Sequence, residues 1–146
     1  FDLDKALWTI PARRMKARRE HIIPLPTQAV ELLKAMHPIT GHTKFVFPNR
    51  DDRQRPMADA ALRQALKKLG WATKYSPHGT RTTGSTRLNE MGYRPDAIEA
   101  QLAHAEPNSV RRTYNHSTYL DERRVMMQDW AVRLDEWKAA AQSNPG

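Results

Sequence analysis

Four side chains in the second half of the sequence have the types and order needed to hold and attack an anionic phosphorus centre. His78 and Arg81 lie three residues apart, and His104 and Tyr114 follow them. Residues three apart at a helix start share one face, where an anion would also meet free backbone N–H groups. A phenol attacks phosphorus only when nearby positive charge or a base activates it. The set is therefore suited to chemistry on a phosphodiester.

Each of these residues also has a purely structural interpretation. His78 could be a turn or cap residue and Arg81 a solvated side chain. His104 could be stabilised by the end of a helix, and Tyr114 could be a core or rim aromatic. Only the combination and order of the four favour a phosphate site.

A dense basic cluster lies nearer the N-terminus. The runs Lys5–Ile10 and His21–Leu25 are β-branched or aromatic and predict a β-hairpin. The loop between them, residues 11–20, is called the basic loop here, and its cations are Arg13, Arg14, Lys16, Arg18 and Arg19. Such cations contact phosphate or solvent. One Lys could also donate a proton, because burial readily shifts a Lys pKa whereas Arg stays charged.

The remaining pattern predicts an α+β fold: a mostly helical single domain with a small antiparallel three-stranded sheet near its N-terminus. Domain boundaries of 1–141 are expected, with residues 142–146 as a disordered tail. The third strand is expected at Phe45–Phe47. Helices are expected over Thr27–Met36, where Pro38 and Gly41 end the helix, and over Met57–Leu69, Gly79–Met91, Pro95–Leu102, a segment carrying Tyr114, and Leu120–Ala140.

The last of these helices carries a regular apolar face. Its members are spaced four, four and three residues apart and are Met126, Trp130, Leu134 and Trp137. Such a stripe is ordinarily core, and the alternative is a surface for a partner.

Composition narrows the class of partner and excludes several chemistries. Of the 146 residues, 24 are Lys or Arg and 16 are Asp or Glu, so the net charge of +8 favours nucleic acid. The sequence has no Cys and no apolar run long enough to span a bilayer. It also lacks a metal-binding His-Glu-x-x-His motif, a phosphate-binding Gly-x-x-x-x-Gly-Lys loop and a Gly-x-Ser-x-Gly elbow. We therefore expect side-chain chemistry without a metal, nucleotide or other cofactor.

Taken together, these features resemble the catalytic domain of tyrosine recombinases. The shared pattern is a Lys in a β-hairpin, His-x-x-Arg opening a helix, Leu-x-His, and a Tyr about ten residues later. In detail, the runs Gln101–Glu106, Arg111–Asn115, Tyr119–Leu120 and Glu122–Arg124 look like the integrases of phages and genomic islands. The resemblance covers residues 3–137. One departure is Ala103, where the family usually has Gly.

The resemblance implies a role for each position. Tyr114 would attack the scissile phosphate to give a 3′-phosphotyrosine and a free 5′-hydroxyl. Arg81 and His104 would contact the phosphate oxygens, His78 would act as general base or proton shuttle, and Lys16 would protonate the leaving 5′-oxygen. The DNA-binding residues would be Arg13, Arg14, Arg18, Arg19, Arg111 and Arg112.

Two of these assignments have neighbouring alternatives. Arg14 and Arg18 flank Lys16, and Tyr119 lies five residues beyond Tyr114. The family also places a first catalytic Arg in a helix upstream of the sheet, before the point at which this sequence begins. We therefore expect this 146-residue piece alone not to cleave DNA.

The implied function is site-specific recombination of double-stranded DNA at attachment sites, for integration or excision of a mobile element. The resemblance further implies a homo-oligomer, a tetramer on DNA, assembled through the C-terminal helix. The location would be the bacterial cytoplasm, in association with the nucleoid. Three alternatives stay open: a topoisomerase-like strand relaxer, a non-catalytic DNA-binding domain, and a protein-interaction domain that uses the Met/Trp helix.

Overall fold

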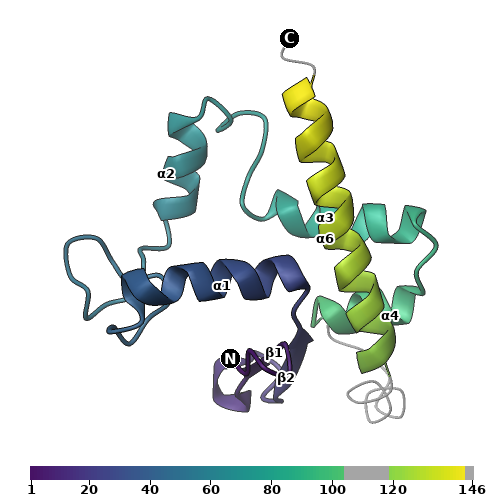
Figure 1. Ribbon diagram of the computed structural model, residues 1–146, viewed down its shortest axis with the longest axis horizontal. Coiled ribbons are helices and arrows are strands. Elements are labelled where there is room, and N and C mark those ends of the chain that lie inside the picture. Colours follow the sequence, from purple (N-terminus) through teal and green to yellow (C-terminus); the bar gives the residue numbers. More distant parts are fainter. Residues whose placement is uncertain (104–118, 144–146) are drawn as a thin grey trace. The chain divides into compact units, whose positions relative to one another are not determined.

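The computed structural model describes residues 1–103 and 119–143 (Figure 1). Its contacts divide the chain into two units. The first contains the described residues of Phe1–Val30 and Ser85–Gly146, and the second contains Glu31–Gly84. The division falls within helices α1 (Thr27–Thr40) and α3 (Gly79–Glu90).

A two-stranded antiparallel hairpin opens the first unit, as the sequence predicts. Strand β1 (Leu7–Ile10) pairs with β2 (His21–Pro24), so that Ile10 lies opposite His21 and Leu7 lies opposite Pro24. Proline lacks an N–H and is tolerated here because both strands of such a sheet are edges. The basic loop begins with a single 3-10 turn, η1 (Ala12–Arg14).

The core of the first unit lies among α3, α4 (Pro95–Gln101) and α6 (Leu120–Ser143). Its buried members are Leu88, Ala97, Ile98 and Met126. The predicted end of α3 is confirmed, because Gly92 adopts a φ of +84° and lets the N–H of Tyr93 donate to the Leu88 carbonyl at 3.1 Å. Pro95 then occupies the first turn of α4.

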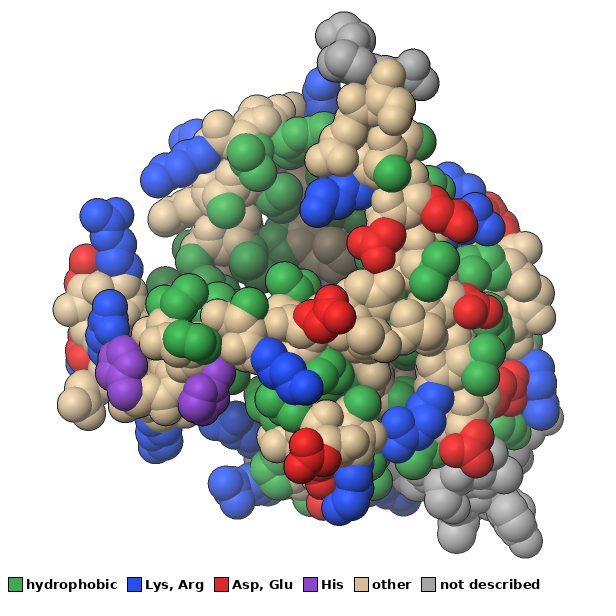
Figure 2. All heavy atoms as spheres, viewed as in Figure 1, with side chains coloured by type: hydrophobic (Ala, Val, Ile, Leu, Met, Phe, Trp, Pro, Cys, Tyr) green, Lys and Arg blue, Asp and Glu red, His purple; other side chains and the backbone are tan. Residues whose placement is uncertain are grey.

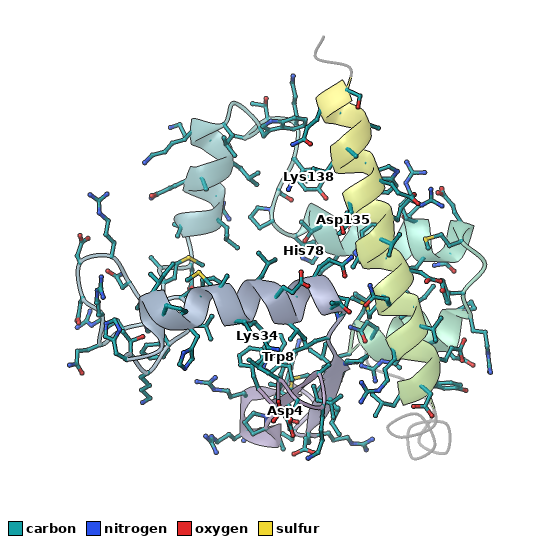
Figure 3. All side chains as sticks on the ribbon, viewed as in Figure 1. Asp4, Trp8, Lys34, His78, Asp135 and Lys138 are labelled. Atoms are coloured by element: carbon teal, nitrogen blue, oxygen red, sulfur yellow. The ribbon has the colours of Figure 1, made fainter. Side chains whose placement is uncertain are left out.

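The start of α1 is attached to α6 by side-chain hydrogen bonds within the first unit. The backbone N–H and Oγ1 of Thr27 both donate to Oε1 of Gln128, at 2.9 and 3.2 Å. Two turns of α6 further on, Asp135 (labelled in Figure 3) accepts a 2.8 Å hydrogen bond from Gln28. Thr27, the first residue of α1, therefore joins α1 to α6.

Helix α1 corrects one sequence prediction in the second unit. It was expected to end before Pro38, but it continues to Thr40. Only two helical residues follow the proline. The hydroxyl of Thr40 donates to the carbonyls of Met36 and Val46, which satisfies the last turn and holds the loop beyond it. The next helix, α2, covers Ala61–Lys68 and is shorter than the expected Met57–Leu69.

The third strand predicted at Phe45–Phe47 is not found, because the sheet in the described part of the chain has two strands. What forms instead is an isolated bridge between Pro48 and Pro56. Two hydrogen bonds flank it, from Met57 N–H to the Phe47 carbonyl and from Asn49 N–H to the Arg55 carbonyl, at 2.8 Å each. Two prolines cannot donate to a ladder, so the pairing does not extend.

Helix α6 is the longest helix described and continues to Ser143, so it includes the first two residues of the expected tail. Its apolar face is graded. Met126 is fully buried, whereas Leu134 is 44% exposed and Trp137 is 39% exposed. Within residues 1–103 and 119–143, no helix combines the length and apolar character that crossing a membrane requires.

Candidate functional site

A turn at Ser76–Pro77 sets the start of α3, where His78 lies (Figure 3). The N–H of Gly79 donates to the carbonyl and hydroxyl oxygens of Ser76, at 2.9 and 3.1 Å. The hydroxyl of Thr80 donates to the Pro77 carbonyl at 2.6 Å. The predicted helix start at Gly79 is confirmed.

His78 and Arg81 are both exposed in this first turn. The sequence led us to expect free backbone N–H groups here that could bind an anion, but two of these groups already donate hydrogen bonds within the protein. Gly79 N–H is bound to Ser76, and Arg81 N–H donates to the His78 carbonyl at 3.0 Å. A phosphate here would therefore meet the two side chains more than these two amides.

Tyr75 is a neighbour of this turn that the sequence reasoning missed. Its hydroxyl lies 3.1 Å from that of Thr83, one turn into α3. A Cβ placed on Gly79 would lie 3.5 Å from the Tyr75 ring, an ordinary contact distance. The ring thus packs beside the start of α3. The signal was an aromatic residue directly before the Ser-Pro turn.

The basic loop presents its cations to solvent. Pro11, Ala12 and Met15 are partly buried, whereas Arg13, Arg14, Lys16, Arg18 and Arg19 are exposed. None of the five is paired with an Asp or Glu of the described residues. Figure 2 shows Lys and Arg side chains projecting around the hairpin. The loop therefore carries five charges that an acidic partner could neutralise.

The structure brings some of the predicted site residues together and leaves others apart. His78 and Arg81 are neighbours in the second unit, and Lys16 belongs to the first. His104, Arg111, Arg112 and Tyr114 lie outside the described residues. The convergence of the five catalytic candidates therefore stays a prediction.

Tyr119, the alternative nucleophile, has a clear structural role in the first unit. Its ring packs against the buried core, and the guanidinium of Arg94 lies over it, 5.0 Å from the ring centroid. The same guanidinium approaches the Tyr119 hydroxyl at 3.4 Å and the Asp96 carboxylate at 3.8 Å. This phenol is already engaged in packing.

Sequence reasoning also missed a buried polar cluster formed by His21, Gln101 and Arg123. Arg123 is 2% exposed, and its burial lowers the pKa of the guanidinium to about 10, which still leaves it protonated at neutral pH. Its Nε donates to Oε1 of Gln101 at 2.9 Å, and its Nη2 donates to the Ile22 carbonyl at 2.6 Å. His21, 5% exposed, places Nε2 3.2 Å from the Gln101 carbonyl. The His21–Gln101–Arg123 cluster joins β2, α4 and α6.

A shallow pocket in the first unit gives no independent site. Its lining consists of Arg87, Glu90, Met91, Arg133 and Trp137. Arg87 pairs with Glu90 at 2.7 Å, and Arg133 pairs with Glu136 at 2.8 Å, so both guanidiniums already have carboxylate partners. Nor do three or more His, Asp or Glu side chains gather to hold a metal ion anywhere in residues 1–103 and 119–143.

Comparison with known proteins identifies the family. The sequence pattern of the phage integrase family matches residues 1–121. The chain is 47% identical to prophage integrase IntZ and 46% identical to prophage integrase IntA, both of Escherichia coli K12, over 92% and 90% of its length. It is 44% identical to the integrase of Shigella phage Sf6 over 92% of its length.

These alignments cover about a third of each relative, namely 33% of IntZ, 32% of IntA and 35% of the Sf6 protein. No solved structure gives a significant match. Because the family pattern spans most of the sequence and the relatives agree with it, this chain belongs to the phage integrase family.

Proposed function

We propose that the whole protein catalyses site-specific DNA recombination that integrates or excises a mobile element. The observation that carries the proposal is the family match over residues 1–121, a range that contains Lys16, His78, Arg81, His104 and Tyr114. The relatives' names, integrases of a phage and of prophages, support the same activity.

The proposed reaction is a transfer of one phosphoryl group between two oxygens. Tyr114 Oη attacks the scissile phosphorus and forms the 3′-phosphotyrosine, while the bond to the 5′-oxygen breaks. His78 accepts or relays the phenol proton, and Lys16 gives a proton to the 5′-oxygen, which leaves as a hydroxyl. The new ester retains the energy of the old one, so attack by a 5′-hydroxyl rejoins the strand without ATP or a metal.

Charge that develops on phosphorus needs donors that are already in place. We assign this role to Arg81 and His104. The exposure of Arg81 in the first turn of α3 is compatible with it. The basic loop, together with Arg111 and Arg112, would contact the DNA backbone. The unpaired charges of the loop support that assignment.

The proposed partners are double-stranded attachment-site DNA and further copies of the same protein. A tetramer on DNA would use the distal half of α6, where Leu134 and Trp137 are 44% and 39% exposed. A partner copy would cover side chains that are half-buried in this chain. The bacterial nucleoid, in the cytoplasm, would be the place of action.

The test uses the full-length protein and a nicked suicide DNA substrate, from which the strand beyond the break diffuses away. A covalent protein–DNA adduct should form with the wild type and be lost in Tyr114→Phe. Tyr119→Phe, which removes a phenol five residues away, is the matched control and should retain the adduct.

Other outcomes would select a different function. An adduct that survives Tyr114→Phe and disappears in Tyr119→Phe would move the nucleophile. Absence of any adduct, with DNA binding retained, would favour a non-catalytic DNA-binding domain. An adduct accompanied by relaxation of supercoiled DNA that lacks an attachment site would favour a topoisomerase-like activity.

A further inference from the structure

The His21–Gln101–Arg123 cluster holds together the end of α4 and the start of α6. In the sequence, His104 and Tyr114 lie between these two elements. Gln101 is the last residue of α4, three positions before His104. Arg123 lies in the first turn of α6, nine positions after Tyr114. The cluster lies entirely in the described part of the first unit.

The geometry makes Arg123 the central member of the cluster. The guanidinium is a rigid planar fork, so two acceptors bound to it are fixed relative to each other. One acceptor is the Gln101 side chain at 2.9 Å, and the other is the Ile22 carbonyl at 2.6 Å. The Gln101 carbonyl faces His21 Nε2 at 3.2 Å. One arginine therefore sets the end of α4 against both the start of α6 and strand β2.

Residues next to the cluster hold the same two ends from the other side. Leu102 and Tyr119 both pack against the buried core that Ile98 and Met126 form. Arg94 lies over the Tyr119 ring. The chain is thus anchored immediately before residue 104 and immediately after residue 118.

Stability alone does not explain a buried arginine at this position. Taking a guanidinium out of water is costly, and an apolar side chain of similar volume in the same place is often neutral or stabilising. Arg123 lies one turn before Met126 on the stripe that α6 buries, where a Met or Leu would fit the pattern. The hydrogen bonds of Arg123 instead fix the distances between the start of α6, the end of α4 and strand β2.

We infer that Arg123 is a positioning residue for DNA cleavage, because it fixes the separation of the two chain ends that carry His104 and Tyr114. The inference rests on the proposed function. Arg123 acts through the position of these residues, and no contact with DNA is needed.

The test measures single-turnover cleavage of the suicide substrate by the full-length protein at saturating DNA, with rate constant and amplitude recorded separately. Arg123→Met keeps length and removes every donor. It should lower the rate constant by about tenfold or more, because small misplacements of reacting groups have large effects on rate. Arg123→Lys keeps the positive charge and one donor nitrogen, and should recover part of the loss. Amplitude and the DNA dissociation constant should stay near wild type.

A neighbouring residue supplies the matched control. Arg124→Met loses the same charge one position further on. The Arg124 guanidinium donates to the Lys5 carbonyl at 3.1 Å, which joins α6 to the hairpin. This hydrogen bond does not involve α4, so the Arg124 variant should cleave at close to the wild-type rate. If Arg123→Met does not fold, Gln101→Leu removes the facing acceptor and should lower the rate constant in the same way.

Two results would overturn the inference. A variant whose rate constant equals that of the wild type, or whose loss is confined to amplitude, would show that the cluster serves folding only. A wild-type protein that forms no Tyr114-dependent adduct would overturn both this inference and the proposed function. The first result is seen in the variants and the second already in the wild type, so the two failures are distinguishable.

Discussion

At the scale of single residues, the phenol of Tyr93 links the turn after α3 to α6 by a hydrogen bond to the Asp129 carboxylate. Burial, and then the carboxylates of Asp129 and Glu122, raise the pKa of Tyr93 to about 12 from its ordinary value of 10.0. The unfolded chain releases this proton near pH 10 and the folded chain only near pH 12. The contribution of Tyr93 to stability is therefore full below pH 10 and falls between pH 10 and 12.

Tyr93→Phe should remove this alkaline loss. Urea unfolding of wild type and variant, compared below pH 10 and then between pH 10 and 12, should show the variant losing less stability on the alkaline side. Asp129→Asn should also lose less stability than the wild type between pH 10 and 12, because it removes the negative charge that faces the Tyr93 hydroxyl. Identical pH dependence of all three proteins would contradict the assignment.

At the scale of elements, the junction between α3 and α4 depends on a backbone conformation that only glycine adopts without strain. Gly92 has a φ of +84°, in the left-handed region. Gly92→Ala should therefore lower the free energy of unfolding by about 1 kcal/mol, the cost of that conformation for a residue with a Cβ. Thermal or urea denaturation measures the change.

Gly79, the first residue of α3, provides the control for that prediction. A Cβ at Gly79 would meet Ser76 Oγ and the Tyr75 ring at 3.5 Å, which are ordinary contacts. Gly79→Ala should be neutral or stabilise by up to about 1 kcal/mol, because it restricts the unfolded chain. If both substitutions destabilise equally, local conformation is not what distinguishes the two positions.

At the scale of the whole molecule, some arginine side chains form ion pairs with carboxylates and others do not. Arg18 and Arg19 have no carboxylate partner among the described residues, whereas Arg87 and Arg133 are paired with Glu90 and Glu136. Changing Arg18 and Arg19 together to Gln should reduce the slope of log Kd against log salt by about 2, at roughly 0.9 per phosphate contact. Binding to a duplex of arbitrary sequence, measured over a salt series, gives the slope.

A second double variant distinguishes the effect of contacts between the basic loop and DNA from the effect of net charge. Changing Arg87 and Arg133 together to Gln also removes two positive charges, but from side chains that already have partners. That double variant should retain the wild-type slope. Equal reductions in the two double variants would mean that net charge alone, and not the basic loop, governs DNA binding.

Several elements could be predicted from the sequence because a local signal dictated them. Gly92 and Pro95 mark the end of one helix and the start of the next, and both helices end and begin where these residues predict. The strand expected at Phe45–Phe47 does not form. Pro48 and Pro56, which pair next to it, have no backbone N–H to donate to a longer ladder. The prediction that α1 stops at Pro38 failed because side-chain hydrogen bonds of Thr40 stabilise the final turn.

The residues of the candidate site could be proposed from the sequence, but their arrangement could not. The family resemblance selected Lys16, His78 and Arg81 by type and order, but their distances depend on long-range packing that sequence spacing does not encode. Arg123 was missed although a signal existed. It stands three positions before Met126 and seven before Trp130, so a charged residue interrupts an apolar stripe. A buried guanidinium requires acceptors from other elements, and those only the fold reveals.

The exposure of the basic loop has a consequence for handling the protein. Proteases of trypsin type cleave after Lys or Arg in accessible chain, and the loop offers five such bonds on a solvent-facing turn. Bound DNA would cover the same side chains. Limited proteolysis would then nick the hairpin in the unbound protein and spare it in the complex, so the fragment pattern would report occupancy without any knowledge of the target sequence.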